Sequence, residues 1–160
     1  MGQQQLILLV LATVIVGIAI VVGIRAFNEN SIKANSDALV QDMVRMADDA
    51  QAWKQKPAPF GGQAEGASKV DPTDFTGADL AGLGYEEDAN NNYTNLNGSY
   101  EVALNGTTLL IHGCNQTKGN YVRLTVDGLS DGDIDNAQVD LGTSDCTAAD
   151  PASGAAAASN

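Results

Sequence analysis

The sequence predicts an α+β protein in which a long N-terminal helix, apolar and then amphipathic, packs on a small antiparallel β-sheet. Residues 6–24 form an unbroken apolar run, and apolar residues then recur at helical spacing as far as residue 55. Alternating apolar residues with a hairpin signal begin at residue 99. The chain is therefore divided into an apolar half-helix, an amphipathic half-helix, a helix-to-sheet loop region and a sheet with its C-terminal segment: residues 1–24, 25–56, 57–98 and 99–160.

The apolar run is long enough to cross a membrane. Its 19 residues contain no charge, Asn or Pro, and a helix of that length spans roughly 28 Å, close to the hydrocarbon thickness of a bilayer. The chain opens Met1-Gly2-Gln3-Gln4-Gln5 without a basic residue, which fits a cleavable secretory signal badly. Arg25 and Lys33 follow the run and by the usual charge rule favour a cytoplasmic C-terminal side, an orientation that we expect to be wrong.

Beyond residue 24 the apolar character becomes one-sided. Residues spaced alternately four and three apart form one helical stripe: Ile32, Ser36, Leu39, Met43, Met46, Ala50 and Trp53. Lys54 falls outside this stripe, and Pro57 and Pro59 stop the helix. We expect one helix from Gln3 to Gln55, on the order of 80 Å long. Its weak points are Gly17 and Gly23, each costing about 1 kcal/mol relative to Ala.

The loop region is expected to hold little regular structure. Residues 57–72 are rich in Pro, Gly and Ala. Thr76 is a candidate N-cap for one or two helical turns that end at Gly84. Residues 86–98 are too polar to bury and are expected to form a surface loop.

The sheet is predicted from two strand pairs. Residues 99–105 alternate, Asn105-Gly106 is typical of a type I′ turn, and residues 107–114 complete a hairpin. Residues 120–126 and 136–142 form the second pair, so we expect three or four strands with one face on the amphipathic half-helix. The candidate core residues are Leu39, Met43, Trp53, Leu104, Leu110, Val122 and Leu124.

Charge and composition argue against several functions. Residues 57–160 hold three basic and fifteen acidic residues, and the whole chain has a net charge of −12. Without a cluster of Lys or Arg, a nucleic-acid partner is not expected. His112 is the only histidine, and we interpret it as a structural residue beside Cys114. We therefore expect no enzymatic activity.

A long helix that is apolar and then amphipathic, followed by a small β domain with Cys114 and Cys146 near its C-terminus, resembles the bacterial type IV pilin family. The match covers the architecture of the whole chain and is motif-like only near the N-terminus. In that family a leader is removed after a Gly and the new N-terminus is methylated. The apolar half-helices leave the inner membrane and bundle in the centre of a filament, with the globular domains outside the cytoplasm.

The N-terminus departs from the family pattern. If the mature chain begins at Met1, which we favour, Gln5 stands where the family usually has a glutamate that pairs with a neighbouring amine. If cleavage follows Gly2, the methylated residue is Gln3 and the corresponding position is Ile7. The helix also lacks the proline that often kinks family members, which leaves its two glycines as sites of local stretching.

The resemblance implies a structural subunit of a type IV pilus-like extracellular filament, serving adhesion or surface attachment. The implied location is an extracellular pilus or the cell surface, with an inner-membrane precursor. The implied partners are copies of the chain in a helical filament, the inner membrane and the pilus assembly machinery. The candidate filament-core residues are Gln5, Leu6, Ala12, Gly17, Ala19 and Gly23. The alternatives are a non-filamentous, membrane-anchored binding module outside the cytoplasm and a pseudopilin of a secretion system.

Two further sites are considered within the acidic domain. Two cysteines in an extracytoplasmic domain predict a disulfide between Cys114 and Cys146, worth about 3 to 4 kcal/mol, with two unpaired thiols as the alternative. The second is a carboxylate-rich turn formed by Asp127, Asp131, Asp133 and Asp135. Because Asn136 and Gly142 replace the Gly and Glu of an EF-hand loop, we favour a solvated acidic turn over a calcium site and expect no cofactor.

The sequence also contains four N-glycosylation patterns, at Asn92, Asn97, Asn105 and Asn115. Turn formation explains these Asn residues equally well. Glycosylation is therefore left open as an alternative.

Overall fold

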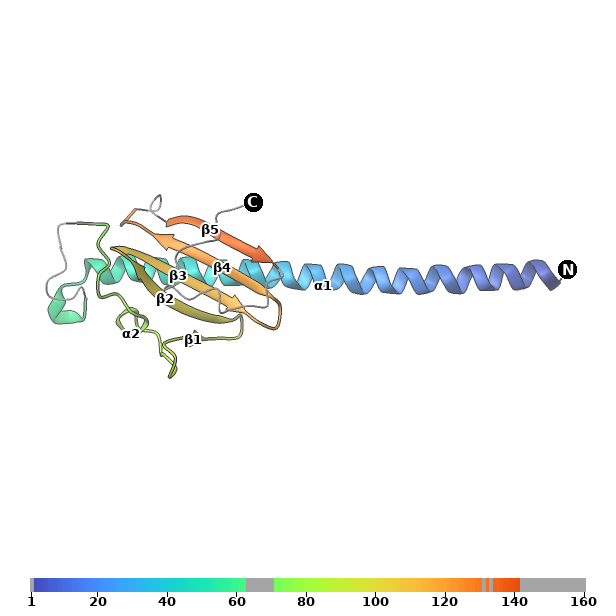
Figure 1. The fold of residues 1–160 in the computed structure, drawn as a ribbon, viewed down its shortest axis with the longest axis horizontal. Helices are drawn as coiled ribbons and strands as arrows, with labels where there is room; N and C mark the ends of the chain where they lie inside the picture. Colours follow the sequence, from blue (N-terminus) through green and yellow to red (C-terminus); the bar gives the residue numbers. More distant parts are fainter. Residues whose placement is uncertain (1, 63–70, 131, 133, 142–160) are drawn as a thin grey trace. The chain divides into compact units, whose positions relative to one another are not determined.

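The structure is a computed structural model that describes residues 2–62, 71–130, 132 and 134–141 (Figure 1). It confirms the predicted α+β fold class. The chain forms two compact units, Met1–Ala34 and Asn35–Asn160, and each is described by itself. The elements in chain order are α1 (Gly2–Gln55), the 3₁₀ turn η1 (Ala58–Phe60), α2 (Leu80–Leu83), β1 (Tyr93–Thr94), β2 (Ser99–Asn105), β3 (Thr108–Asn115), β4 (Asn120–Val126) and β5 (Ile134–Leu141).

Helix α1 matches the predicted helix to within one residue at its start, and it ends at Gln55 as expected. The apolar stripe is confirmed, because Ser36, Leu39, Met43, Met46, Ala50 and Trp53 are all buried. Lys54 lies off this stripe but is buried as well, since its side chain is only 3% exposed. Its ammonium group donates to the backbone carbonyl of Asp74 and lies 5.9 Å from the ring centroid of Phe75. The flexible stem of a lysine allows this burial while the charged end keeps a partner.

The sheet is antiparallel and its strands lie in chain order, β1-β2-β3-β4-β5 (Figure 1). It contains five strands where the sequence predicted three or four, because β1 lies within the segment that was expected to be a polar loop. Tyr93 pairs with Tyr100 of β2, and its partly buried ring packs against the core. A single aromatic residue thus gives the polar segment enough apolar surface to form an edge strand. Strand β5 begins at Ile134, two residues before the predicted start.

The hairpin between β2 and β3 is confirmed, but its turn differs from the prediction. Asn105 pairs with Thr108, so the two loop residues are Gly106 and Thr107 rather than Asn105 and Gly106. Gly106 has φ +68°, whereas a type I′ turn requires positive φ at both loop residues. A glycine at the first loop position fits a type II′ turn, which places Asn105 in the strand.

The core lies between the sheet and residues 39–53 of α1. Tyr100, Leu109, Ile111, Val122, Leu124 and Val126 face Leu39, Met43, Met46, Ala47, Ala50 and Trp53 in one cluster, together with Phe75 and Leu80. The prediction is wrong for two of the candidate core residues, which lie outside the core. Leu104 stands next to the hairpin turn and is 38% exposed. Leu110 is adjacent to the core residues Leu109 and Ile111, so the alternation of the strand turns it to the opposite face.

Helix α2 is a single turn with well-defined caps. Its N-cap is Asp79 and not Thr76, because the backbone N–H of Gly82 donates to Asp79 Oδ1 at 2.6 Å. The Thr76 hydroxyl instead donates to Asp74 Oδ1 at 2.6 Å, which closes a turn before the helix. Gly84 ends α2 as predicted, with φ +90°. Leu80 is the buried residue of this turn and attaches the loop to the core.

Candidate functional site

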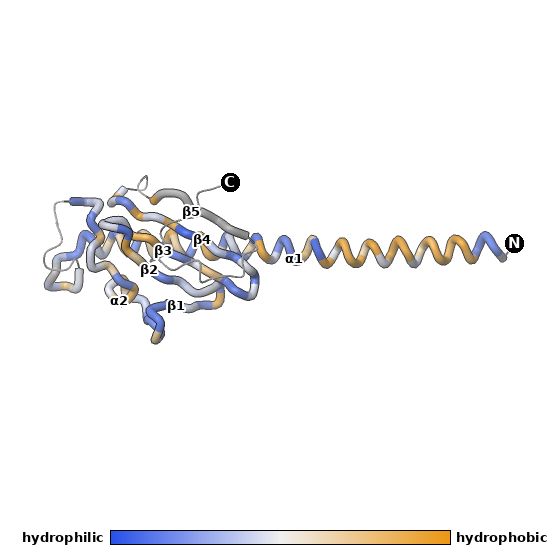
Figure 2. Tube along the Cα trace, in the orientation of Figure 1, coloured by the Kyte–Doolittle hydropathy of each residue, from blue (hydrophilic) through white to orange (hydrophobic). Residues whose placement is uncertain are grey.

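The apolar surface of α1 over residues 6–24, here called the apolar helix surface, is the first candidate. Its large apolar side chains are between 51% and 67% exposed. Figure 2 shows the hydrophobic colouring continuing along this part of α1. By length and composition the helix can cross a membrane, and none of its most apolar window is buried within the protein. An exposed apolar area of this size requires a lipid or protein environment to cover it.

The predicted filament-core residues all lie on α1 and are exposed, but they do not share one face. At 3.6 residues per turn, Gln5, Ala12, Ala19 and Gly23 fall within an arc of about 40°. Leu6 and Gly17 lie roughly 100° or more away from that arc. We call Ala12, Ala19 and Gly23 the small-residue face. A Cβ added at Gly17 or Gly23 meets nothing within 4 Å, so the isolated chain tolerates larger residues at both glycines.

The structure does not test the predicted N-terminal processing. Met1 lies outside the described residues, and Gln3 lies in the first turn of α1, which begins at Gly2. Both predictions therefore stay predictions.

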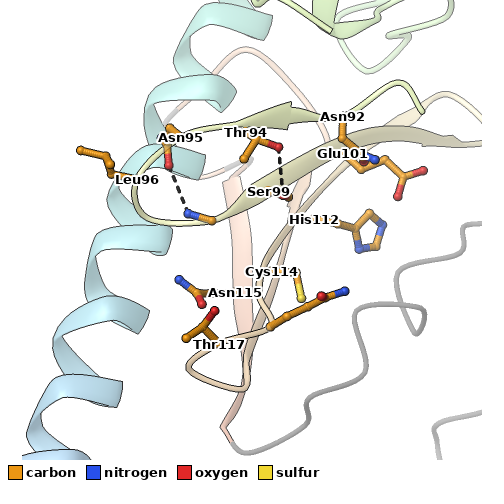
Figure 3. Close-up of a pocket in the computed structure, with 12 residues that line it drawn as sticks. Asn92, Thr94, Asn95, Leu96, Ser99, Glu101, His112, Cys114, Asn115 and Thr117 are labelled. Atoms are coloured by element: carbon orange, nitrogen blue, oxygen red, sulfur yellow. Dashed lines mark hydrogen bonds between the residues drawn. The ribbon is translucent and has the colours of Figure 1, made fainter. Parts of the chain in front are cut away.

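The second candidate is a pocket of about 560 Å³ on the face of the sheet that points away from α1, here called the outer-face pocket. Figure 3 shows the loop after β1 on one side and the turn after β3 on the other. Ser99, Glu101, His112 and Cys114 alternate with core residues along β2 and β3, and this alternation brings them to the pocket. The remaining lining residues are Asn92, Thr94, Asn95, Leu96, Gly98, Asn115, Gln116 and Thr117.

His112 is a buried member of the pocket wall. Its cross-strand neighbours are Glu101 on β2 and Arg123 on β4, and the residue is 5% exposed. Its Nδ1 lies 2.6 Å from the hydroxyl of Tyr121, and the two rings stack at 5.9 Å. Burial, followed by the positive charge of Arg123, lowers the pKa of His112 to about 4. The ring is therefore neutral at neutral pH, and its Nε2 is buried with no hydrogen-bond partner.

Two predicted sites in the acidic domain fall partly outside the described residues. Cys114 is buried on β3 and is not a free thiol. Cys146 lies outside the described residues, so the pairing of these two cysteines stays a prediction.

The carboxylate-rich turn is described only at its start. Asp131 and Asp133 lie outside the described residues, and the side chain of Asp135 is likewise not described. Asp127 Oδ1 accepts a hydrogen bond from the Thr108 hydroxyl at 2.8 Å, which ties this carboxylate to β3. Within the described ranges no three His, Cys, Asp or Glu side chains lie close enough to hold a metal ion. The calcium alternative is thus neither supported nor tested.

The four glycosylation patterns differ in how far their Asn side chains are engaged. Asn97 donates its side-chain amide to Asp42 Oδ2 at 2.7 Å, and Asn115 donates to the carbonyl of Asn97 at 2.5 Å. Asn92 lines the outer-face pocket and is half-buried. Asn105 is exposed at the end of β2. Turn and loop formation thus accounts for Asn97 and Asn115, and Asn105 has the most accessible position.

Sequence reasoning missed a carboxylate that joins α1 to the sheet. Asp42 Oδ2 accepts hydrogen bonds from the Tyr100 hydroxyl at 2.6 Å, Asn97 at 2.7 Å and Asn95 at 2.9 Å. Burial alone would raise the pKa of Asp42, but these hydrogen bonds and the charge of Arg45 outweigh it, so the pKa is lowered. The only sequence signal was the position of Asp42 next to Met43 of the buried stripe.

A row of tyrosines continues this junction. The Tyr85 hydroxyl donates to Asp49 Oδ2 at 2.6 Å. The rings of Tyr85 and Tyr93 lie 4.9 Å apart, and those of Tyr93 and Tyr100 lie 6.0 Å apart. Burial and the adjacent carboxylates raise the pKa of both Tyr85 and Tyr100, so both remain neutral donors. The two helix carboxylates and this row of rings hold the β1 edge of the sheet against α1.

No family model, no curated protein and no solved structure matches this chain. Its α+β layout is consistent with a pilin-like fold, and its apolar helix is compatible with membrane anchoring. The family resemblance itself rests on the architecture and stays a prediction.

Proposed function

We propose that this chain is a structural subunit of a type IV pilus-like extracellular filament that serves adhesion or surface attachment. The observation that carries the proposal is the apolar helix surface, which is exposed around its whole circumference. Such a helix needs a continuous apolar environment. The inner membrane provides it before assembly, and the same helix of neighbouring copies provides it in a filament.

The small-residue face supports helix-to-helix packing. Transfer of a helix from lipid into a protein bundle brings little hydrophobic gain, so close packing must supply the attraction. Ala12, Ala19 and Gly23 allow backbones to approach closely, and Gln5 on the same arc offers a hydrogen-bonding group. Gln5 cannot neutralise an amine as a glutamate would, so the N-terminal contact would be a neutral hydrogen bond.

A membrane-anchored binding module is the second candidate function. The outer-face pocket favours it, because a polar concavity is a feature of ligand-binding domains and is not required for a filament. A pseudopilin of a secretion system shares the helix argument and differs only in the length of the assembly.

Mass spectrometry of the N-terminal peptide tests the proposal directly. Material sheared from intact cells is compared with the membrane pellet of the same cells. A processed and methylated N-terminus in the sheared fraction is the expected result, and it also decides between Met1 and Gln3 as the mature start. An unprocessed chain confined to the pellet would make the protein a membrane-anchored domain.

Gly23→Leu, on the small-residue face, tests the role of helix packing. The variant keeps the segment apolar, so we expect normal recovery in the membrane fraction and a yield of sheared filaments reduced at least tenfold. Val16→Leu on the same helix is the matched control, because it enlarges an already large apolar residue. Normal filaments from Gly23→Leu would count heavily against the packing model.

A further inference from the structure

The outer-face pocket has the dimensions of a small-molecule site. Its volume of about 560 Å³ lies within the range of roughly 300 to 1,000 Å³ that is common for ligand pockets. The walls come from rigid strands, since Glu101 and His112 are paired across β2 and β3. The ends come from the loop after β1 and the turn after β3 (Figure 3).

The lining chemistry narrows the class of ligand. Most lining side chains are amides or hydroxyls, which can both donate and accept hydrogen bonds: Asn92, Thr94, Asn95, Ser99, Asn115, Gln116 and Thr117. Glu101 adds a carboxylate, and no Lys or Arg is among the described lining residues. This combination, in a chain of net charge −12, disfavours an anionic ligand. The scarcity of apolar side chains disfavours an apolar one.

Two residues point to a ligand with both polar and apolar surfaces. Leu96 is fully exposed at the edge of the pocket and offers a small apolar contact. His112, on the other side of the pocket in Figure 3, has a buried Nε2 without a partner. Because nearly all buried polar atoms in folded proteins are hydrogen-bonded, this nitrogen indicates a polar group that is absent from the isolated chain.

We propose that the outer-face pocket binds a neutral polyhydroxylated ligand, of the class of short saccharides. Saccharide hydroxyls donate and accept in the same way as the amide and hydroxyl lining, and their C–H faces suit the exposed Leu96. A water buried beneath the ligand supplies the missing partner of the His112 Nε2. This binding is independent of filament assembly and goes beyond the proposed structural function.

Saturation-transfer NMR on the full chain tests the proposal. The protein is kept in a detergent without a sugar headgroup, and the probes are neutral mono- and disaccharides, with glucuronate as an anionic comparison. We expect saturation transfer to at least one neutral saccharide and none to glucuronate. Absence of transfer to every neutral saccharide, or stronger binding of glucuronate, would overturn the proposal.

Paired variants locate the site. Thr117→Val and Gln116→Ala change exposed residues of the turn after β3, and each is expected to weaken binding at least fivefold. Thr107→Val is the matched control, since Thr107 is an exposed threonine in the turn between β2 and β3 and does not line the pocket. Unchanged binding in both pocket variants, or equal loss in Thr107→Val, would place the binding elsewhere and refute the site.

Discussion

Asp42 shows how one helix residue can fix the edge of the sheet. Its carboxylate lies beside the buried stripe of α1 and accepts from Tyr100, Asn97 and Asn95, which belong to β2 and the loop before it. The side-chain amide of Asn97 that completes this contact is partly buried. A charged acceptor with several donors is one of the stronger polar contacts available to a small domain.

Asp42→Asn should therefore destabilise the domain by about 1 to 3 kcal/mol, because the amide cannot accept three hydrogen bonds at one oxygen position. Denaturant unfolding of the full chain in detergent measures the change. Asp37→Asn, at an exposed position on the same helix, is the control and should have little effect. Since the folded pKa of Asp42 is lowered, its contribution is present at neutral pH and is lost as the pH falls through that pKa. The difference between wild type and variant should then shrink in acid.

His112 should make stability depend on pH in a separate window. Its pKa falls from an ordinary 6.5 to about 4 on folding, so the unfolded chain binds a proton between these values and the folded chain does not. Stability should decline as the pH falls from 6.5 towards 4, by on the order of 3 kcal/mol from this residue. The titratable groups next to the His112 ring are its cross-strand neighbours Glu101 and Arg123 and the hydroxyl of Tyr121.

His112→Gln removes this titration, and its free energy of unfolding should fall less steeply over that interval. The slope is the measurement, so a lower stability of the variant at all pH values does not affect the test. Equal slopes for the two proteins would show that His112 does not carry the effect.

At the scale of elements, the sequence predicted well those structures that rest on a pattern repeated over many residues. The stripe from Ser36 to Trp53 repeats over five helical turns, and each repeat reinforces the same face. The hairpin from residue 99 was also predicted, because alternation and a turn dipeptide agree. These features depend on local sequence, which is why sequence alone determines them.

The predictions failed where the structure depends on a single residue or on a contact between residues far apart in the sequence. Asn105 and Gly106 specify a tight turn, but the pairing of the strands decides which two residues occupy it. That register also decides which of Leu109 and Leu110 faces the core. Strand β1 depends on Tyr93 meeting Tyr100 and α1, a contact that the polar segment 86–98 does not reveal.

Gly98→Ala should expose how closely the start of β2 approaches its neighbours. An added Cβ would lie 2.4 Å from the Cys114 carbonyl oxygen and 2.8 Å from Leu39 Cδ2. Because the first neighbour is backbone, the strand must shift, and we expect a loss of about 1 to 3 kcal/mol in chemical denaturation. Gly17→Ala is the control, since its Cβ meets nothing and helix propensity should favour it. An unchanged stability for Gly98→Ala would contradict this packing.

At the scale of the whole molecule, the chain separates the surface that needs an apolar environment from the part that folds around its own core. Helix α1 contributes residues to both units, and the core cluster begins only at Leu39. The apolar helix surface was predicted from composition alone, because 19 consecutive residues leave no ambiguity. The outer-face pocket was not predicted from the sequence, because it forms only when the loop after β1 and the turn after β3 lie at the same part of the sheet.

A chain that begins at Arg25 should consequently be soluble and fold without detergent. We expect its melting temperature to lie within a few degrees of the full chain in detergent, because the removed residues make no contribution to the core cluster. Circular dichroism and size-exclusion chromatography measure the fold and the oligomeric state. Precipitation or a much lower melting temperature would mean that residues 1–24 take part in the fold.

Trp53 gives the domain an internal optical reporter. It is the only tryptophan of the chain, and it is 4% exposed at the end of α1. Its indole nitrogen lies close to α2, since a Cβ at Gly82 would be 3.1 Å away from it. Excitation at the red edge of the absorption band therefore observes a single site, and separation of α2 from α1 should shift its fluorescence to longer wavelength. Comparing this emission with circular dichroism thus distinguishes detachment of α2 from unfolding of the sheet, without any attached dye.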